Sequence, residues 1–213
     1  MTCDVISTGS KGNAVVLGGE ILIDCGVPFK LLERYIWKLR IVLLTHQHRD
    51  HINPATVRRL HQTRPTLRFG CCHWMVEHLL AAGVAPQNID VMEPDVGYAY
   101  VSAGWLIQPF PLWHDVENCG YFVDIGNERA LYATDTGSLD HVEAKGLDLY
   151  LIEANHTEEE IAERIRRKLA AGEFVYEYRA QSGHLSREKA DSWLAANATP
   201  GRSRVVYLHQ HQD

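Results

Sequence analysis

The sequence of 213 residues contains no long hydrophobic run and no cysteine pattern typical of a disulfide or zinc scaffold. No apolar segment approaches the roughly 20 residues that a membrane-spanning helix needs, and the first twenty residues lack the pattern of a secretory signal peptide. We therefore expect a cytoplasmic protein that makes no membrane contact. The cysteines are odd in number and form no Cys-x-x-Cys pair, which argues against a disulfide framework and against thiolate zinc ligands. They are Cys3, Cys25, Cys71, Cys72 and Cys119.

Acidic residues are missing from one stretch of an otherwise acidic chain. The formal net charge is −6, which argues against a protein that coats duplex nucleic acid with its whole surface. From His51 through Val76, however, there is no Asp or Glu. Four arginines occur there: Arg58, Arg59, Arg64 and Arg68. The stretch is either a solvated helix face beside an acidic metal site or a surface that contacts substrate phosphates, which makes Arg58 and Arg59 candidate substrate-binding residues.

The segment Thr45-His46-Gln47-His48-Arg49-Asp50-His51 carries the most chemistry. It follows the apolar run Ile41–Leu44, which is typical of a fully buried strand. It precedes Asn53-Pro54, an N-cap residue followed by proline at the first helical position, which predicts a helix start. The segment is therefore a strand-to-helix turn, the place where open α/β sheets put their sites.

The spacing within this segment favours metal binding. His46 and His48 are two residues apart, so in extended chain both rings lie on one side. Asp50 and His51 turn with the backbone and can face a second point. Three imidazoles and a carboxylate within six residues suit a borderline metal such as zinc, and their arrangement favours a two-metal site over a metal-free polar loop.

Two aspartates elsewhere end predicted strands. Asp24 follows Ile21-Leu22-Ile23, and it either holds a turn, which we favour, or supports a ligand histidine. Asp135 precedes Thr136-Gly137 and either caps that turn or uses its two oxygens to bridge two cations. We take Asp135 as the candidate bridge.

The order of predicted elements indicates two strand-rich halves, each followed by helices. This pattern predicts two β-sheets packed face to face with helices outside, in one domain over residues 1–213. Strands are expected at 3–7, 14–17, 21–24, 41–44, 68–71, 105–110, 119–125, 129–135, 147–152 and 204–208. Helices are expected at 29–37, from 54, at 74–82, from 157 to about 171, and at 187–197.

The His-x-His-x-Asp-His motif resembles the signature of metallo-β-lactamase-fold hydrolases, and the whole chain is most similar to their tRNase Z/YycJ-like branch. The further markers are Leu22–Gly26, His114, Ala133–Gly137, Glu153-Ala154-Asn155-His156, Gly183-His184-Leu185-Ser186 and His209. The resemblance implies an αββα four-layer sandwich that binds two divalent metal ions, zinc or manganese.

The resemblance also implies roles for individual residues. One metal would be held by His46, His48, His114 and Asp135, and the other by Asp50, His51, Asp135 and His209, with His211 as the alternative to His209. Asp50 would also orient the attacking hydroxide. His184, or with less support His156, would protonate the leaving oxygen, and His156 is otherwise a substrate-binding candidate.

The function that the resemblance implies is hydrolysis of a phosphodiester, and a nuclease acting on DNA or RNA is favoured. The alternative is a cyclic-nucleotide phosphodiesterase of the anti-Pycsar kind, which fits the acidic composition and the lack of room for the tRNA-gripping arm of tRNase Z. A third interpretation is a non-catalytic binding module stabilised by metal. The sequence does not fix the oligomeric state, and a homodimer is one of the assemblies that it allows.

Overall fold

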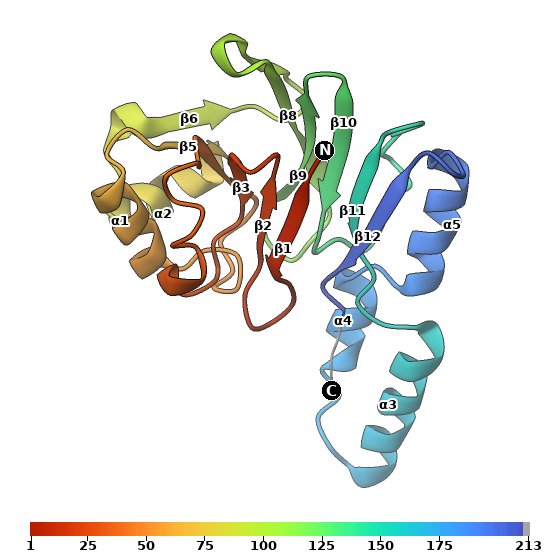
Figure 1. The fold of residues 1–213 in the computed structure, drawn as a ribbon. Helices are drawn as coiled ribbons and strands as arrows, with labels where there is room; N and C mark the ends of the chain where they lie inside the picture. The colour runs from red at the N-terminus through yellow and green to blue at the C-terminus, as the bar shows by residue number, and fades with distance from the viewer. Residues whose placement is uncertain (211–213) are drawn as a thin grey trace.

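A computed structural model describes residues 1–210, which form two six-stranded β-sheets (Figure 1). The strands of the first sheet lie in chain order: β1 (Cys3–Ser7), β2 (Ala14–Leu17), β3 (Ile21–Ile23), β4 (Ile41–Leu44), β5 (Arg68–Cys72) and β6 (Ile89–Met92). The second sheet also follows chain order: β7 (Tyr98–Tyr100), β8 (Trp105–Leu112), β9 (Asn118–Ile125), β10 (Glu128–Ala133), β11 (Leu149–Glu153) and β12 (Arg204–Leu208). Strands β3 to β6 pair in parallel, as do β10 to β12, and the remaining pairs are antiparallel.

Strand β4 shows how the sequence builds the layers. Because side chains alternate across a strand, Ile41 and Leu43 face the second sheet, where they join a core with residues of β8 to β11. Val42 and Leu44 face the opposite way and pack in a core with the helices that cover the first sheet. Both faces are buried, which confirms the prediction of a fully buried strand and explains why the run is apolar without alternation.

The helices occupy the outer layers. They are α1 (Pro54–Thr63), α2 (Val76–Ala81), α3 (Glu158–Ala171), α4 (Glu177–Gly183) and α5 (Arg187–Asn197). Helices α1 and α2 contribute Val57, Leu60 and Leu79 to the core on the first sheet, and α5 contributes Trp193 and Leu194 to the core on the second. The αββα sandwich is therefore confirmed. Helices α3 and α4 extend away from it (Figure 1).

The helix starts follow the predicted capping chemistry. The Asn53 side chain accepts hydrogen bonds from the backbone of Ala55 and Thr56, at 3.1 and 3.3 Å. Thr157 and Glu160 form a reciprocal capping box at the start of α3. Within the described residues, no helix is long and apolar enough to cross a lipid bilayer.

The structure differs from the expected elements in three places. The helix expected over 29–37 is a short 3₁₀ helix, Phe29–Leu31, continued by turns with i to i+3 hydrogen bonds such as Tyr35 to Leu32. The helix expected over 74–82 begins as a 3₁₀ turn, His73–Met75, before α2. Strands β6 and β7 and helix α4 were not expected, because each is short and lacks a periodic apolar pattern. Two further 3₁₀ turns flank β6 and β7: Pro86–Asn88 and Val101–Ala103.

Candidate metal centre

The predicted ligands lie on loops that leave one edge of the two sheets. The motif follows β4, His114 follows β8, and Asp135 follows β10. Glu153 ends β11, and His209 follows β12. Because β8, β10, β11 and β12 run in the same direction, their carboxyl ends meet at the same edge of the second sheet.

Three histidines form the first group of donors. His46 Nε2 lies 3.1 Å from His48 Nδ1, and His114 Nε2 lies 3.3 Å from the same atom. The His46 side chain is fully buried, whereas that of His48 is 36% exposed. The structure thus brings together the residues predicted to supply the nitrogens of one metal site. Asp115, which the sequence analysis did not single out, adds an exposed carboxylate at 3.2 Å from His114 Nε2.

Asp135 lies at the centre of the second group. Its Oδ2 is 2.6 Å from His51 Nε2 and 3.3 Å from His46 Nε2, and its Oδ1 faces His209 Nδ1. Asp50 Oδ2 lies 3.7 Å from His51 Nε2 and 4.0 Å from His209 Nε2. The one carboxylate therefore faces both predicted donor sets.

The backbone at the site adopts a conformation that L-residues rarely take. Among the described residues, four non-glycine residues have a positive φ, and three of them are Asp24 (58°), Asp135 (57°) and His209 (52°). Such conformations persist where the surrounding structure fixes them, and they cluster at functional sites.

Asp24 does more than hold a turn, which corrects the interpretation favoured from the sequence. Its Oδ2 accepts a hydrogen bond from His51 Nδ1 at 2.7 Å, and both side chains are fully buried. Its Oδ1 accepts a hydrogen bond from the Thr45 backbone at 3.0 Å. Asp24 thereby fixes the orientation of the His51 ring and leaves Nε2 to face Asp135.

Glu153 is a site residue to which the sequence analysis gave no role. Its side chain is fully buried, and Oε1 accepts hydrogen bonds from His184 Nδ1 at 2.6 Å and from His209 Nδ1 at 3.0 Å. Oε2 accepts from the backbone of Thr136 and Leu185, at 3.1 and 3.2 Å. The sequence did hold a signal, because Glu153, like Asp24, is an acid at the carboxyl end of a buried strand.

The carboxylates and burial shift the protonation of the histidines in opposite directions. Burial lowers the pKa of His46 to about 4, so its imidazole is neutral. Burial also disfavours charge on His184 and His209, but hydrogen bonds to Asp135 and Glu153 outweigh it and raise their pKa values to about 10 and about 9. Burial works against ionisation of Asp135, yet His51 and the other histidines hold its pKa well below the usual value.

The donors fit divalent metal ions. The nitrogen and oxygen donors form three groups, and within each group the donor atoms lie within 4.8 Å of one another. The groups are His46, His48 and His114; His46, His51 and Asp135; and Asp135, Glu153, His184 and His209. Asp135 Oδ1 is buried and faces the Nδ1 atoms of His184 and His209. Imidazole and carboxylate donors suit zinc and manganese, and a cation would relieve the cost of burying these atoms together.

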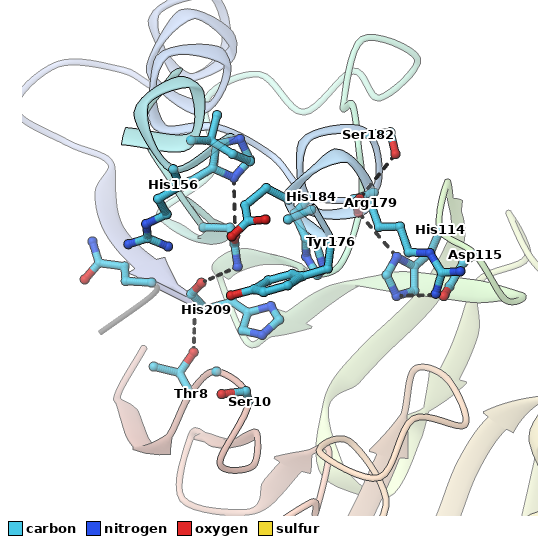
Figure 2. A pocket seen from close by; sticks show the side chains of 18 of the residues that line it. Thr8, Ser10, His114, Asp115, His156, Tyr176, Arg179, Ser182, His184 and His209 are labelled. Carbon is cyan, nitrogen blue, oxygen red and sulfur yellow. Dashed lines mark hydrogen bonds and ion pairs between the residues drawn. The ribbon is translucent and has the colours of Figure 1, made fainter. Parts of the chain in front are cut away.

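A cavity of about 920 Å³ adjoins the donors (Figure 2). His114, His184 and His209 line one part of it, and His156, a predicted substrate-binding residue, lines another. His156 Nε2 is buried and has no hydrogen-bond partner in residues 1–210. The N-cap of α3 is the neighbouring Thr157, so the His156 side chain does not cap that helix.

Arg58 and Arg59 do not line this cavity. Both lie on α1, where Arg58 Nε donates to the Ala82 carbonyl at 3.3 Å and the Arg59 guanidinium lies 4.2 Å from the centre of the Phe29 ring. Three other cationic residues line the cavity instead: Lys11, Arg164 and Arg179. His211, the predicted alternative to His209, lies outside the described residues.

Comparison with known proteins agrees with this architecture. Residues 20–210 match the family model of the beta-lactamase superfamily domain, so the chain belongs to that family. The exodeoxyribonuclease YycJ of Bacillus anthracis is 24% identical over 227 aligned residues, which cover 98% of this chain and 82% of the relative.

Two solved structures share the fold. The short form of human tRNase Z superposes with a TM-score of 0.73 and 16% identity, over 100% of this chain and 93% of the other. Zinc-bound PqqB of Methylobacterium extorquens gives a TM-score of 0.67 and 13% identity, over 99% of this chain and 89% of the other. The chain is therefore a metallo-β-lactamase-fold hydrolase, and its likeness to YycJ supports the resemblance to the tRNase Z/YycJ-like branch.

Proposed function

We propose that the protein is a nuclease that hydrolyses phosphodiester bonds of DNA or RNA with two divalent metal ions. The observation that carries the proposal is the position of Asp135, whose carboxylate faces His46 of the first predicted ligand set and His51 and His209 of the second. The names of the relatives add to it, since YycJ is an exodeoxyribonuclease and tRNase Z is an RNase.

The ligands proposed for each ion are those that the family resemblance implies. His46, His48, His114 and Asp135 would hold the first ion, and Asp50, His51, Asp135 and His209 would hold the second. Bound ions of this kind lower the pKa of a bound water and neutralise charge on phosphoryl oxygens. Zinc and manganese both accept this mixture of donors.

The chain's own residues supply the remaining chemistry. Glu153 accepts a hydrogen bond from His184 Nδ1, so the ring is held in a fixed orientation and its Nε2 can carry a proton on the cavity side. Hydrogen bonds to Asp135 and Glu153 raise the pKa of His184 to about 10, and a protonated His184 ring would donate to the leaving oxygen. Asp50, with 26% of its side chain exposed, would orient an attacking hydroxide.

The test is a substrate panel of single- and double-stranded DNA, RNA and cyclic nucleotides, each assayed with zinc and with manganese. We expect turnover of a polynucleotide. Efficient turnover of a cyclic nucleotide with inert polynucleotides would replace the nuclease by a cyclic-nucleotide phosphodiesterase. Inactivity on every substrate, including a nitrophenyl diester, would leave a metal-stabilised binding module. Homodimer formation stays a prediction, which light scattering on the purified protein would test.

A further inference from the structure

The cavity beside the metal centre contains an aromatic side chain that the proposed chemistry does not use. Tyr176 lies between α3 and α4, lines the cavity and is 50% exposed. Figure 2 shows its ring in the cavity that also holds His184 and His209. A half-exposed aromatic ring beside a candidate active centre is a contact surface for a flat ligand group.

The Tyr176 ring is supported on one face. The Lys168 ammonium lies 3.6 Å from the ring centre, which is a cation–π contact. Lys168 is itself held by Glu177, whose Oε1 lies 2.7 Å from Nζ and whose side chain is 3% exposed. The ion pair with Glu177 thus holds the Lys168 ammonium against the Tyr176 ring. The exposed half of the side chain remains available to a ligand, with little ordering needed on binding.

The same cavity offers groups that suit phosphates and polar base edges. Lys11 and Arg179 line it, and within residues 1–210 neither side-chain charge has a hydrogen bond or an ion pair. The buried His156 Nε2 also lacks a partner there. An anionic group joined to a flat aromatic ring would satisfy all of these features, and a nucleotide has that chemistry.

We infer that Tyr176 stacks on the nucleobase next to the scissile phosphate and so makes the enzyme select unpaired strand ends. The inference rests on the proposed nuclease function. A base inside a duplex is already stacked on both faces, whereas a base at a single-stranded end can leave its neighbours and lie on an aromatic ring. Stacking of this kind tolerates every base, so the selection is for strand state and not for sequence.

The experiment compares two oligonucleotides that differ by one base. One is intact, and the other carries an abasic residue next to the scissile phosphate. Tyr176→Ala should raise KM for the intact strand by roughly tenfold, the worth of one base–aromatic stack, and leave KM for the abasic strand unchanged. Tyr176→Phe keeps the ring and should behave as the wild type. Tyr178→Ala is the matched control, because Tyr178 lies two residues further along the chain in α4, is 52% exposed and does not line the cavity.

A second readout does not need turnover. An oligonucleotide ending in 5-iodouracil, irradiated with the protein in the presence of a chelator, should crosslink to the peptide that contains Tyr176. Equal effects of Tyr176→Ala on both strands, or a crosslink elsewhere with KM unchanged, would overturn the stacking role while the nuclease function stands. Absence of turnover on every nucleic acid together with absence of a crosslink would overturn both.

Discussion

At the scale of the residue, Asp135 joins the two halves of the site. Its carboxylate is 2% exposed and faces His46, His51 and His209, which come from both sheets. These histidines stabilise the negative charge of the buried Asp135 carboxylate, and they lower its pKa although burial acts in the opposite direction. The residue is therefore the point at which metal binding is most sensitive to substitution.

Asp135→Ala should remove both metal ions, because a single bridge holds each of them. Protein purified without chelator should carry close to two transition metals per chain by elemental analysis. His209→Ala should weaken mainly the second ion. The control is Asp140→Ala, an exposed aspartate away from the donor groups. Full metal content and activity in Asp135→Ala would show that the ligand assignment is wrong.

His184→Ala should keep both metal ions and lose roughly 10²–10⁴-fold in turnover, the usual contribution of a positioned proton donor. The loss should shrink with a nitrophenolate leaving group, which departs without a proton. Turnover of the two substrate types, measured alongside metal content, separates a proton donor from a ligand. Equal losses on both substrates would contradict the donor role, and loss of metal would make His184 a ligand.

At the scale of the element, the loop that follows β4 packs directly against Gly26, where there is no space for a side chain. A Cβ added at Gly26 would lie 1.8 Å from the Asp50 carbonyl oxygen and 2.7 Å from the His51 backbone nitrogen. These contacts are backbone atoms, which cannot rotate aside. The close approach of two loops therefore sets the position of two predicted ligands.

Gly26→Ala should displace the motif, lower metal content and reduce stability by roughly 1–3 kcal/mol, as overpacking does. Thermal unfolding and elemental analysis on the same sample measure both effects. Gly97→Ala is the control, because its added Cβ would meet the flexible Leu106 side chain at 3.3 Å. A Gly26→Ala protein with wild-type metal content would show that this loop contact does not position the ligands.

Elements with a strong local signal were predicted well, and those that depend on tertiary contacts were not. The run Ile41–Leu44 and the caps at Asn53 and Thr157 were read correctly, because burial on both faces and capping are written in a few adjacent residues. The segment 29–37 has helical spacing, but it packs as turns against the first sheet. Helix α4 has no apolar period, so nothing in the sequence marked it.

The candidate site divides in the same way. The motif histidines were found from their spacing, whereas His114, His209 and His184 came only through a family resemblance, since spacing alone cannot bring distant loops together. Whether Asp24 holds a turn or supports a ligand histidine depends on its contact with His51, which is 27 residues away. The sequence does not reveal that contact. Tyr176 had no signal at all, because its role depends on how α3 and α4 extend beside the cavity.

At the scale of the whole molecule, the question is which positive charges meet the substrate of a protein with a net charge of −6. The acid-free stretch predicted Arg58 and Arg59, but in the structure they lie on α1 outside the cavity. The cavity is lined instead by Lys11 of the β1–β2 loop, Arg164 of α3 and Arg179 of α4. The lack of acidic residues in one stretch of the chain indicates a basic segment, but it does not indicate which side of the fold that segment faces.

The salt dependence of cleavage distinguishes the pair Lys11 and Arg179 from the pair Arg58 and Arg59. Each phosphate contact that is lost should reduce the salt slope of polynucleotide binding by about one unit. The double variant Lys11→Ala with Arg179→Ala should therefore raise KM and flatten the slope by about two units, and leave a small chromogenic diester unaffected. Arg58→Ala with Arg59→Ala removes the same charge and should change little. KM measured from low to physiological salt, for both double variants, gives the comparison.

Three results are informative. A larger effect of the Arg58 and Arg59 pair would mean that the strand passes over α1 and that the cavity cations are not the main phosphate contacts. A steep slope lost with Lys11 and Arg179 supports a polynucleotide entering through the cavity, because a mononucleotide carries too little charge to produce it. A flat slope in the wild type, with efficient turnover of a cyclic nucleotide, would favour the phosphodiesterase over the nuclease.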